Sequence, residues 1–310
     1  MAQFLPDILA FFFITAFIAQ RFSVDLRLPD AAYQLITYIL LITIGLKGGQ
    51  AISSNASLTL IGESSLVIVM GLVITFAALM FIKIGSKLNK NDSVTLAAHY
   101  GSVSVGTFAV AVSFLEMQGI SYELTLNLFV ALLELPAIIL GLYLLSDKQH
   151  KLDVKTILAH KSLVLIVIGM LIGTLYGDIS QPMTNNLKPM FSVMLALYLV
   201  HMGALAGSKI SDIGPNKYFI ICFGIAMPII GASIALFVAW LIGLSHGGAA
   251  LLTVLGASAS YIAVPAVFEQ AHPEANVAQA LFASLAISFS FNVIWGIELY
   301  TGAAKYITNI

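Results

Sequence analysis

The sequence contains very few charged residues and almost no cysteine. Only 9% of its 310 residues are charged, whereas soluble domains carry about 25%, which argues against a soluble globular protein. The single cysteine, Cys222, lies in an apolar run, so neither a disulfide framework nor a cysteine-based metal site is available. The net charge is −1 and no basic cluster occurs, which gives no reason to expect a nucleic-acid partner.

The sequence also lacks the short motifs of membrane enzymes and pumps. It contains no H-E-x-x-H, no G-x-S-x-G, no Walker loop and no pair of membrane aspartates. Intramembrane proteolysis and ATP-driven pumping need these groups, so the sequence supports neither function. We therefore expect a protein that is not an enzyme and that uses no organic cofactor.

What the sequence has in abundance is apolar residues, gathered in runs long enough to cross a membrane. Hydrophobic residues make up 59% of the chain. A helix of about 20 mostly apolar residues spans the hydrocarbon core and satisfies its own backbone hydrogen bonds there. The sequence thus predicts an all-α membrane protein with about ten transmembrane helices. The runs are residues 4–19, 31–46, 66–84, 93–117, 124–145, 162–176, 190–205, 218–242, 248–268 and 277–300.

The loops between these runs carry most of their positive charge on one side of the membrane. If all the runs cross, eleven of the 14 lysine and arginine residues lie on the same side. By the positive-inside rule this side is the cytoplasm, which puts both termini outside a bacterial inner membrane. The eleven are Arg21, Arg27, Lys83, Lys87, Lys90, Lys148, Lys151, Lys155, Lys161, Lys209 and Lys217, and the others are Lys47, Lys188 and Lys305.

The two halves of the chain resemble each other weakly. Residues 44–52 are similar to 202–210, and residues 101–106 stand opposite 256–261 as small, polar breaks inside apolar runs. Because each half has an odd number of crossings, the second half is expected to be inverted relative to the first, as in many secondary transporters. We predict a first five-helix repeat at residues 1–146, a cytoplasmic linker at 147–161 and a second, inverted five-helix repeat at 162–310.

The two breaks rich in glycine and serine are the main candidates for a substrate site. Glycine lowers helix stability by about 1 kcal/mol relative to alanine, so we predict that both segments are broken helices. At such a break the freed N–H groups of the second half-helix form an anion site, and freed carbonyls can hold a cation. The alternative is that small residues only let helices pack closely. The candidate residues in the breaks are Gly101, Ser102, Ser104, Thr107, Gly256, Ser258 and Ser260.

Glu134 is an acidic residue near the expected middle of the membrane. An ionised carboxylate there costs at least ~2.5 kcal/mol and is usually kept for function, although a protonated or structurally paired carboxyl is the alternative. Pro136 removes a donor beside it, which can free carbonyls for a cation. Asn292 in the second half offers an amide that either lines the site or bridges helices. His99 and His201 are candidate proton carriers, or neutral core histidines.

Five segments in order along the chain form a recognisable pattern. They are residues 42–52, 101–104 with Thr107, 133–137, 256–267 and 291–297. Taken together, over nearly the whole chain, they resemble the sodium-dependent bicarbonate transporter family. The chain departs from that pattern at Glu134, where the family has aspartate, and at Val105 and Gly106, where it has glycine and serine. The second departure leaves the identity of the anion open.

The resemblance implies a core domain with two crossing broken helices and a gate domain that forms homotrimers. It also implies that bicarbonate is held by half-helix N-termini, with Tyr261 as a further lining residue. Sodium would lie beside the anion, near Glu134, Ser104 and Asn292. The family's cytoplasmic partner is a PII-like regulatory protein, but the central loop at 147–161 is short for such a role.

The function expected from the sequence is secondary active symport. Sodium would drive the import of a small anion, with bicarbonate as the first choice. One alternative is the same fold carrying another small anion or a carboxylate, with sodium or proton coupling. The other is a membrane sensor or scaffold that binds a partner without transport.

Overall fold

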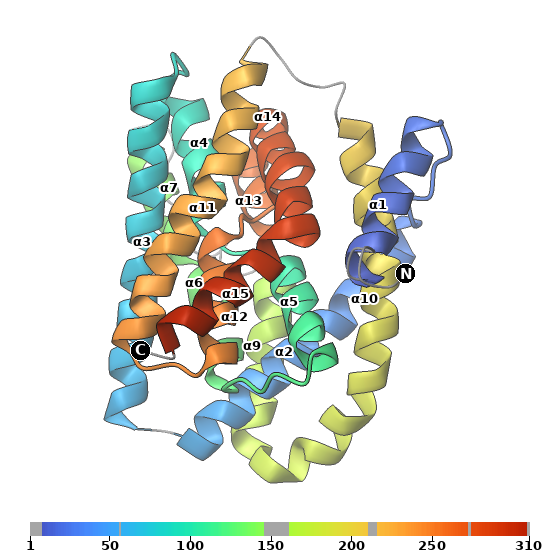
Figure 1. Ribbon diagram of the computed structural model, residues 1–310, viewed down its shortest axis with the longest axis vertical. Helices are drawn as coiled ribbons and strands as arrows, with labels where there is room; N and C mark the ends of the chain where they lie inside the picture. Colours follow the sequence, from blue (N-terminus) through green and yellow to red (C-terminus); the bar gives the residue numbers. More distant parts are fainter. Residues whose placement is uncertain (1–7, 56, 146–160, 210–215, 272–273, 309–310) are drawn as a thin grey trace.

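The computed structural model describes residues 8–55, 57–145, 161–209, 216–271 and 274–308, and all regular secondary structure in these ranges is helical (Figure 1). The all-α class predicted from the sequence is therefore confirmed. Of the linker predicted at 147–161, only Lys161, the first residue of a helix, lies inside the described residues.

Four helices pack together as one group, which we call the small bundle. Helix α2 packs along α9, and α1 packs along α10, with α10 also against α2. Glycines allow the α2–α9 contact, because a Cβ on Gly45 or Gly49 would overlap the backbone of α9. The four helices are α1 (Ile8–Arg21), α2 (Asp30–Asn55), α9 (Lys161–Tyr176) and α10 (Gln181–Lys209), the last preceded by the short 3₁₀ turn η2 (Gly177–Ser180).

The remaining helices form a second group, the large bundle, which occupies the left and centre of Figure 1. It contacts the small bundle mainly where α2 lies against α6. From the first half it contains α3 (Leu58–Gly85), α4 (Lys90–Gly101), α5 (Val105–Met117), α6 (Thr125–Glu134) and α7 (Pro136–Leu145). From the second half it contains α11 (Lys217–Leu241), α12 (His246–Ala257), α13 (Ala263–Ala271), α14 (Val277–Leu281), the π-helical turns η4 (Phe282–Phe289) and η5 (Asn292–Gly296), and α15 (Ile297–Thr308).

The helical segments have the length and composition of membrane spans. In the part of the chain that the structure describes, 8 segments are long and apolar enough to cross a membrane, and two shorter apolar helices accompany them at Phe11–Arg21 and His246–Ala257. The span from Lys90 to Met117 differs from the others because its most apolar window is 100% buried inside the protein. This span, which contains the first predicted break, therefore does not face lipid.

Both predicted breaks are present. Helix α4 ends at Gly101, Ser102 is extended, and α5 begins after Ser104, whose Oγ accepts the N–H of Thr107 at 3.0 Å. Serine is a favoured N-cap because its side chain replaces a missing intrahelical partner. Helix α12 ends at Ala257 and α13 begins only at Ala263. The prediction of two broken helices is confirmed.

A third interruption lies between α6 and α7. Helix α6 ends at Glu134 and α7 begins at Pro136, which agrees with the prediction that Pro136 loosens the helix. The corresponding segment of the second half contains no such stop, but instead the two π-helical turns η4 and η5. Such turns leave backbone groups out of the regular α-helical register and are frequent near functional sites.

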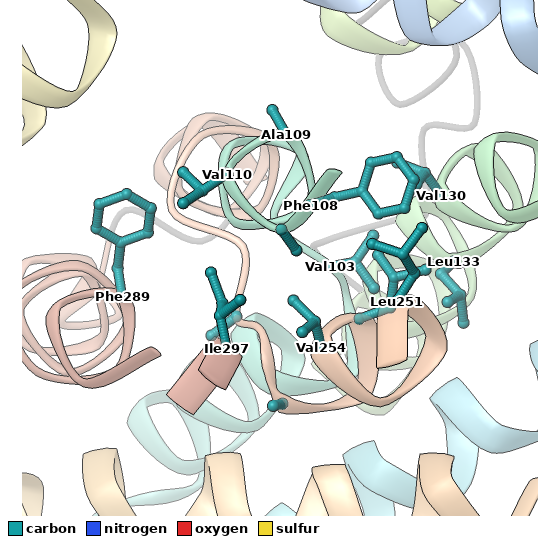
Figure 2. Packing of buried hydrophobic residues seen from close by; sticks show 14 of the residues in the cluster. Val103, Phe108, Ala109, Val110, Val130, Leu133, Leu251, Val254, Phe289 and Ile297 are labelled. Atoms are coloured by element: carbon teal, nitrogen blue, oxygen red, sulfur yellow. The ribbon is translucent and has the colours of Figure 1, made fainter. Parts of the chain in front are cut away.

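The first break is held in place by a layer of apolar side chains. Figure 2 shows Phe108 of α5, Leu133 of α6 and Leu251 of α12 near Val103, and all four belong to one cluster of buried side chains. Close packing of this kind leaves little freedom to neighbouring groups. The non-helical backbone around Val103 is thereby fixed from several sides at once.

Candidate functional site

The two breaks lie against each other and are joined by two hydrogen bonds. The N–H of Ser104 donates to Oγ of Ser258 at 2.9 Å, and the N–H of Ser260 donates to the carbonyl of His99 at 2.7 Å. Non-helical backbone at membrane depth is stable only where its polar groups find partners inside the protein. Each break therefore supplies partners for the other, and the two form one structural unit.

A small cavity lies where the breaks meet the small bundle. The volume that the centre of a water-sized sphere can occupy in this cavity is about 30 Å³. A single water needs ~10–15 Å³ by the same measure, so the space suits a small ion and a water or a compact anion. Its walls come from α2, α10, both breaks and the end of α6. The lining residues are Thr37, Leu40, Leu41, Val103, Ser104, Val105, Gly106, Glu134, Tyr198, Ser260, Tyr261, Ile262 and Ala263.

The N-termini of two helices open onto this cavity. Helix α5 starts at Val105 and α13 starts at Ala263, and both residues line the cavity. The first N–H groups of a helix have no intrahelical partner, and they carry a partial positive charge of ~0.5 at each N-terminus. Ser104 Oγ accepts from Thr107, which leaves the amides of Val105 and Gly106 available at the cavity wall. Such an arrangement attracts anions.

Glu134 brings a carboxylate to the same cavity. Its side chain is only 4% exposed, and among the described residues its carboxylate makes no hydrogen bond and no ion pair, while its backbone carbonyl accepts from Ser102 Oγ at 3.1 Å. Leaving a buried carboxylate without a partner is strongly unfavourable. The site is therefore electrostatically incomplete and is suited to a cation next to Glu134.

A second polar atom near the α5 N-terminus also lacks a partner. The hydroxyl oxygen of Thr107 is buried and makes no hydrogen bond within the part of the chain that the structure describes. On α4, which precedes the break, the Thr95 hydroxyl and Nε2 of His99 are also buried without a hydrogen-bond partner among the described residues. Buried polar side-chain atoms are satisfied in the large majority of cases, so a group of them around one break points to a place where solutes or water bind.

The comparison with known proteins places the chain in a family. A family model described as the Na+-dependent bicarbonate transporter superfamily matches residues 6–305. The chain belongs to this superfamily. No curated protein matches the chain. The resemblance carried by the five sequence segments is thus confirmed, and the helical, membrane-spanning architecture described above is that of a superfamily of transporters.

In this superfamily member, four of the predicted site residues line the cavity and six do not. The four are Ser104, Glu134, Ser260 and Tyr261. Of the six, Ser102 and Ser258 hold backbone groups of the neighbouring segments. The predicted residues outside the cavity lining are Gly101, Ser102, Thr107, Gly256, Ser258 and Asn292.

Gly101, Gly256 and Asn292 serve the geometry of the breaks. A Cβ on Gly101 would overlap the hydroxyl of Thr75, and a Cβ on Gly256 would overlap Cβ of Ala235, so both glycines allow close helix contacts. The Asn292 amide donates to the carbonyl of Ala257 at 2.9 Å. Its oxygen accepts from Tyr300 at 3.0 Å. Of the two roles considered for Asn292, these bonds correspond to bridging helices.

The sequence did not single out Tyr198, which reaches the cavity from α10 of the small bundle. Its hydroxyl lies 2.7 Å from the hydroxyl of Tyr261. The available signal was a polar aromatic residue inside an otherwise apolar run. Gly106 was noted only as a departure from the family pattern, yet it lines the same wall.

The two histidines considered as proton carriers lie outside the cavity lining. His201 stacks on Tyr33 with ring centroids 4.5 Å apart, and its Nδ1 accepts the N–H of Leu28 at 2.9 Å. It thereby holds the loop between α1 and α2. In that loop a hydrogen-bonded ion pair with Arg27 lowers the pKa of Asp25 to about 2. His99 is engaged through Nδ1 with the carbonyl of Thr95 at 2.8 Å.

A wider polar depression lies at the opposite end of α2, on the side predicted to be extracytoplasmic. It has a volume of about 560 Å³ and is lined by Lys47 and Glu116, among other polar residues. Lys47 Nζ lies 3.8 Å from Oε1 of Glu116, so the ion pair joins α2 of the small bundle to α5 of the large bundle. Tyr122 donates to the same carboxylate at 3.3 Å, and burial raises the pKa of this tyrosine.

Proposed function

We propose that this protein is a sodium-coupled secondary active importer of a small anion, and that the anion is bicarbonate. The observation that carries the proposal is that two helix N-termini and an unpartnered carboxylate meet in one buried cavity of small volume. Membership of a superfamily described as Na+-dependent bicarbonate transporters supports the same choice of ions.

The anion would bind at the N-termini of α5 and α13. The amides of Val105, Gly106 and Ala263 supply donors, and the hydroxyls of Ser104 and Ser260 lie beside them. Bicarbonate has four non-hydrogen atoms, so it would fill a cavity about the size of two water molecules, and sodium beside it would require the walls to move slightly apart. A larger organic anion would require the walls to move apart.

Sodium would bind beside the anion, with Glu134 and Ser104 as ligands. Sodium prefers oxygen ligands, and carbonyls freed at the breaks are further candidates. Asn292 would act indirectly, because it holds the Ala257 carbonyl at the end of α12. A cation and an anion ~4 Å apart attract each other by about 4 kcal/mol at the effective dielectric constant of a protein site. Binding of one ion would therefore strengthen binding of the other by up to about 10³-fold, which is the basis of coupling.

Transport would follow from movement of the small bundle against the large bundle. In this proposal the small bundle is the gate domain and the large bundle is the core domain, the two halves are inverted repeats, and both termini face outward from a bacterial inner membrane. A homotrimer formed through the gate domain and a PII-like cytoplasmic regulator belong to the same proposal. Both rest on the family resemblance.

Uptake into proteoliposomes tests the proposal directly. Labelled bicarbonate is presented at alkaline pH, where little CO₂ can leak through lipid, with an inward gradient of either sodium or potassium. We expect uptake with sodium and only background uptake with potassium, with protein-free liposomes as the control. Equal uptake in the two salts would reject sodium coupling.

The same assay separates the alternatives. A panel of small anions and carboxylates competing with bicarbonate would reveal another cargo, and replacing the sodium gradient by a proton gradient would reveal proton coupling. A sensor or scaffold would bind the anion in detergent yet give no flux in liposomes under any gradient.

A further inference from the structure

One hydrogen bond at the cavity joins the two bundles and is not explained by the binding of sodium and an anion at helix N-termini. The hydroxyls of Tyr198, on α10 of the small bundle, and Tyr261, in the second break of the large bundle, lie 2.7 Å apart. Both side chains are buried, and both line the cavity. Ser104 lines the same cavity, and we call the two phenol hydroxyls on its wall the polar edge.

Gly106 makes room for this edge. A Cβ at residue 106 would overlap the Tyr261 hydroxyl and would lie 2.6 Å from the Tyr198 hydroxyl. Any side chain there would push the phenols away from the α5 N-terminus. Because Gly106 has none, the hydroxyls stand directly beside the backbone amides that are proposed to bind the anion.

The rings behind the hydroxyls are packed in a way that fixes their positions. Tyr198 stacks on Tyr33 with centroids 6.1 Å apart, and Tyr33 stacks in turn on His201 at 4.5 Å. On the other side, Tyr261 meets Phe289 edge to face at 5.2 Å. Pairs of this geometry are stabilising, so the two hydroxyls are held at the cavity from both bundles.

A pair of phenol hydroxyls still has donor capacity for a ligand. Each hydroxyl can donate one hydrogen and accept at two lone pairs. When one tyrosine donates to the other, one hydrogen of the pair remains for a third group. An oxygen atom of a bound anion is a suitable acceptor for that hydrogen, whereas a methyl group in the same place cannot accept it.

We propose that Tyr198, together with Tyr261, determines specificity for trigonal oxyanions with three oxygen atoms, such as bicarbonate and nitrate, over carboxylates of equal size, such as acetate. Two oxygens bind at the helix N-termini and the third oxygen accepts from the tyrosine pair. This inference rests on the proposed anion site and deepens it, since it selects among the small anions that the site could carry.

The expected discrimination is modest for a physical reason. A site that leaves buried polar groups unpaired rejects the wrong ligand by large factors. Here the two tyrosines can still bond each other when acetate is bound, so only the net value of one hydrogen bond is lost, which corresponds to about tenfold in affinity.

The test compares nitrate and acetate as ligands in the presence of sodium. The wild-type protein and the double variant Tyr198→Phe/Tyr261→Phe are assayed in detergent by the anion-induced rise in melting temperature, and in liposomes by competition with labelled bicarbonate. Both tyrosines are changed because Tyr198→Phe alone would leave the Tyr261 hydroxyl free to donate to the anion. Tyr306→Phe is the matched control, because it removes the same oxygen from an exposed position on α15. We expect wild type and Tyr306→Phe to bind nitrate about tenfold more tightly than acetate, and the double variant to bind the two within about twofold, because neither tyrosine can then donate to the third oxygen.

A second variant, Gly106→Ala, changes the space that α5 leaves for the two tyrosine hydroxyls. Gly106→Ala displaces the hydroxyls without removing them, and we expect it to weaken nitrate binding at least about tenfold while the protein still folds. Equal nitrate and acetate affinities in wild type, or a wild-type ratio in a folded Tyr198→Phe/Tyr261→Phe protein, would overturn the inference. The binding measurement needs no flux, so a protein that fails to import bicarbonate yet discriminates nitrate from acetate refutes the transport proposal and not this one.

Discussion

Replacing Glu134 by glutamine tests the electrostatic reasoning on which the cation site depends. Glu134 is 4% exposed, lines the cavity and has no side-chain partner among the described residues. The substitution keeps the shape of the side chain and removes its charge. We expect the variant to lose sodium binding while its folded structure stays intact.

The magnitude follows from the distance and the surroundings. A unit charge ~4 Å from sodium contributes about 4 kcal/mol at an effective dielectric constant of 20. Part of this is offset by removing sodium from water, so we expect sodium affinity to fall by at least about 100-fold. At a sodium concentration 100 times the wild-type Kd, sodium stabilises the folded wild-type protein by about 2.7 kcal/mol, and a variant with 100-fold weaker affinity by only about 0.4 kcal/mol.

The assay is thermal unfolding in detergent over a series of sodium concentrations, with potassium replacing sodium at constant ionic strength. The melting temperature of the wild type should rise with sodium, and that of Glu134→Gln should barely change. In sodium-free buffer the variant should be at least as stable as wild type, because it no longer buries an unpaired carboxylate. Glu298→Gln, at an exposed position of α15, is the control for loss of a carboxylate as such.

Two results would refute this reasoning. A Glu134→Gln protein with the sodium response of wild type would remove the carboxylate from the cation site. A variant that is strongly destabilised even without sodium would show instead that the carboxylate has a structural partner in the membrane.

Two further predictions concern the scaffold around the site. Ser258→Ala removes the acceptor of the Ser104 N–H, and leaving that buried donor unpaired should lower stability by about 1–3 kcal/mol, measured by thermal or denaturant unfolding; an unchanged stability would mean that the two breaks do not depend on this bond. Gly49→Val would drive a side chain into the backbone of α9 at Met170, so we expect poor folding yield on size-exclusion chromatography, whereas Gly62→Ala, which faces open space on α3, should behave as wild type; equal yields would contradict the close α2–α9 packing.

The parts of the site that could be predicted from the sequence are those with a local cause. The breaks at Ser102 and Ser258 follow from glycine and serine inside apolar runs, and the interruption after Glu134 follows from Pro136, because each depends on the conformational preference of a few neighbouring residues. The position of Glu134 midway along the candidate span Thr125–Leu145 could likewise be read from its distance to the ends of its apolar run.

The sequence could not show which residues from distant segments come into contact at the site. Tyr198 reaches the cavity because α10 packs against the second break, and nothing within the run 190–205 indicates which neighbour that face will meet. The bond between Asn292 and the Ala257 carbonyl depends equally on the packing of the last segment on α12. The helix ends also differ from the ends of the apolar runs that predicted them. Helix α3 begins at Leu58, before the run 66–84, and α10 extends over Gln181–Lys209, beyond the run 190–205.

The hydrogen bonds that tie the two breaks together have a consequence for motion. Since the Ser104 N–H donates to the Ser258 hydroxyl, and the Ser260 N–H donates to the His99 carbonyl, the two breaks are linked to each other within the large bundle. Only α2 and Tyr198 are contributed by the other bundle. In the proposed transport cycle, movement of one bundle against the other would leave the ligands from the large bundle in place. Only the contact with Tyr198 and the wall formed by α2 would be replaced by water, so opening toward either face of the membrane would not require the two breaks to be rearranged.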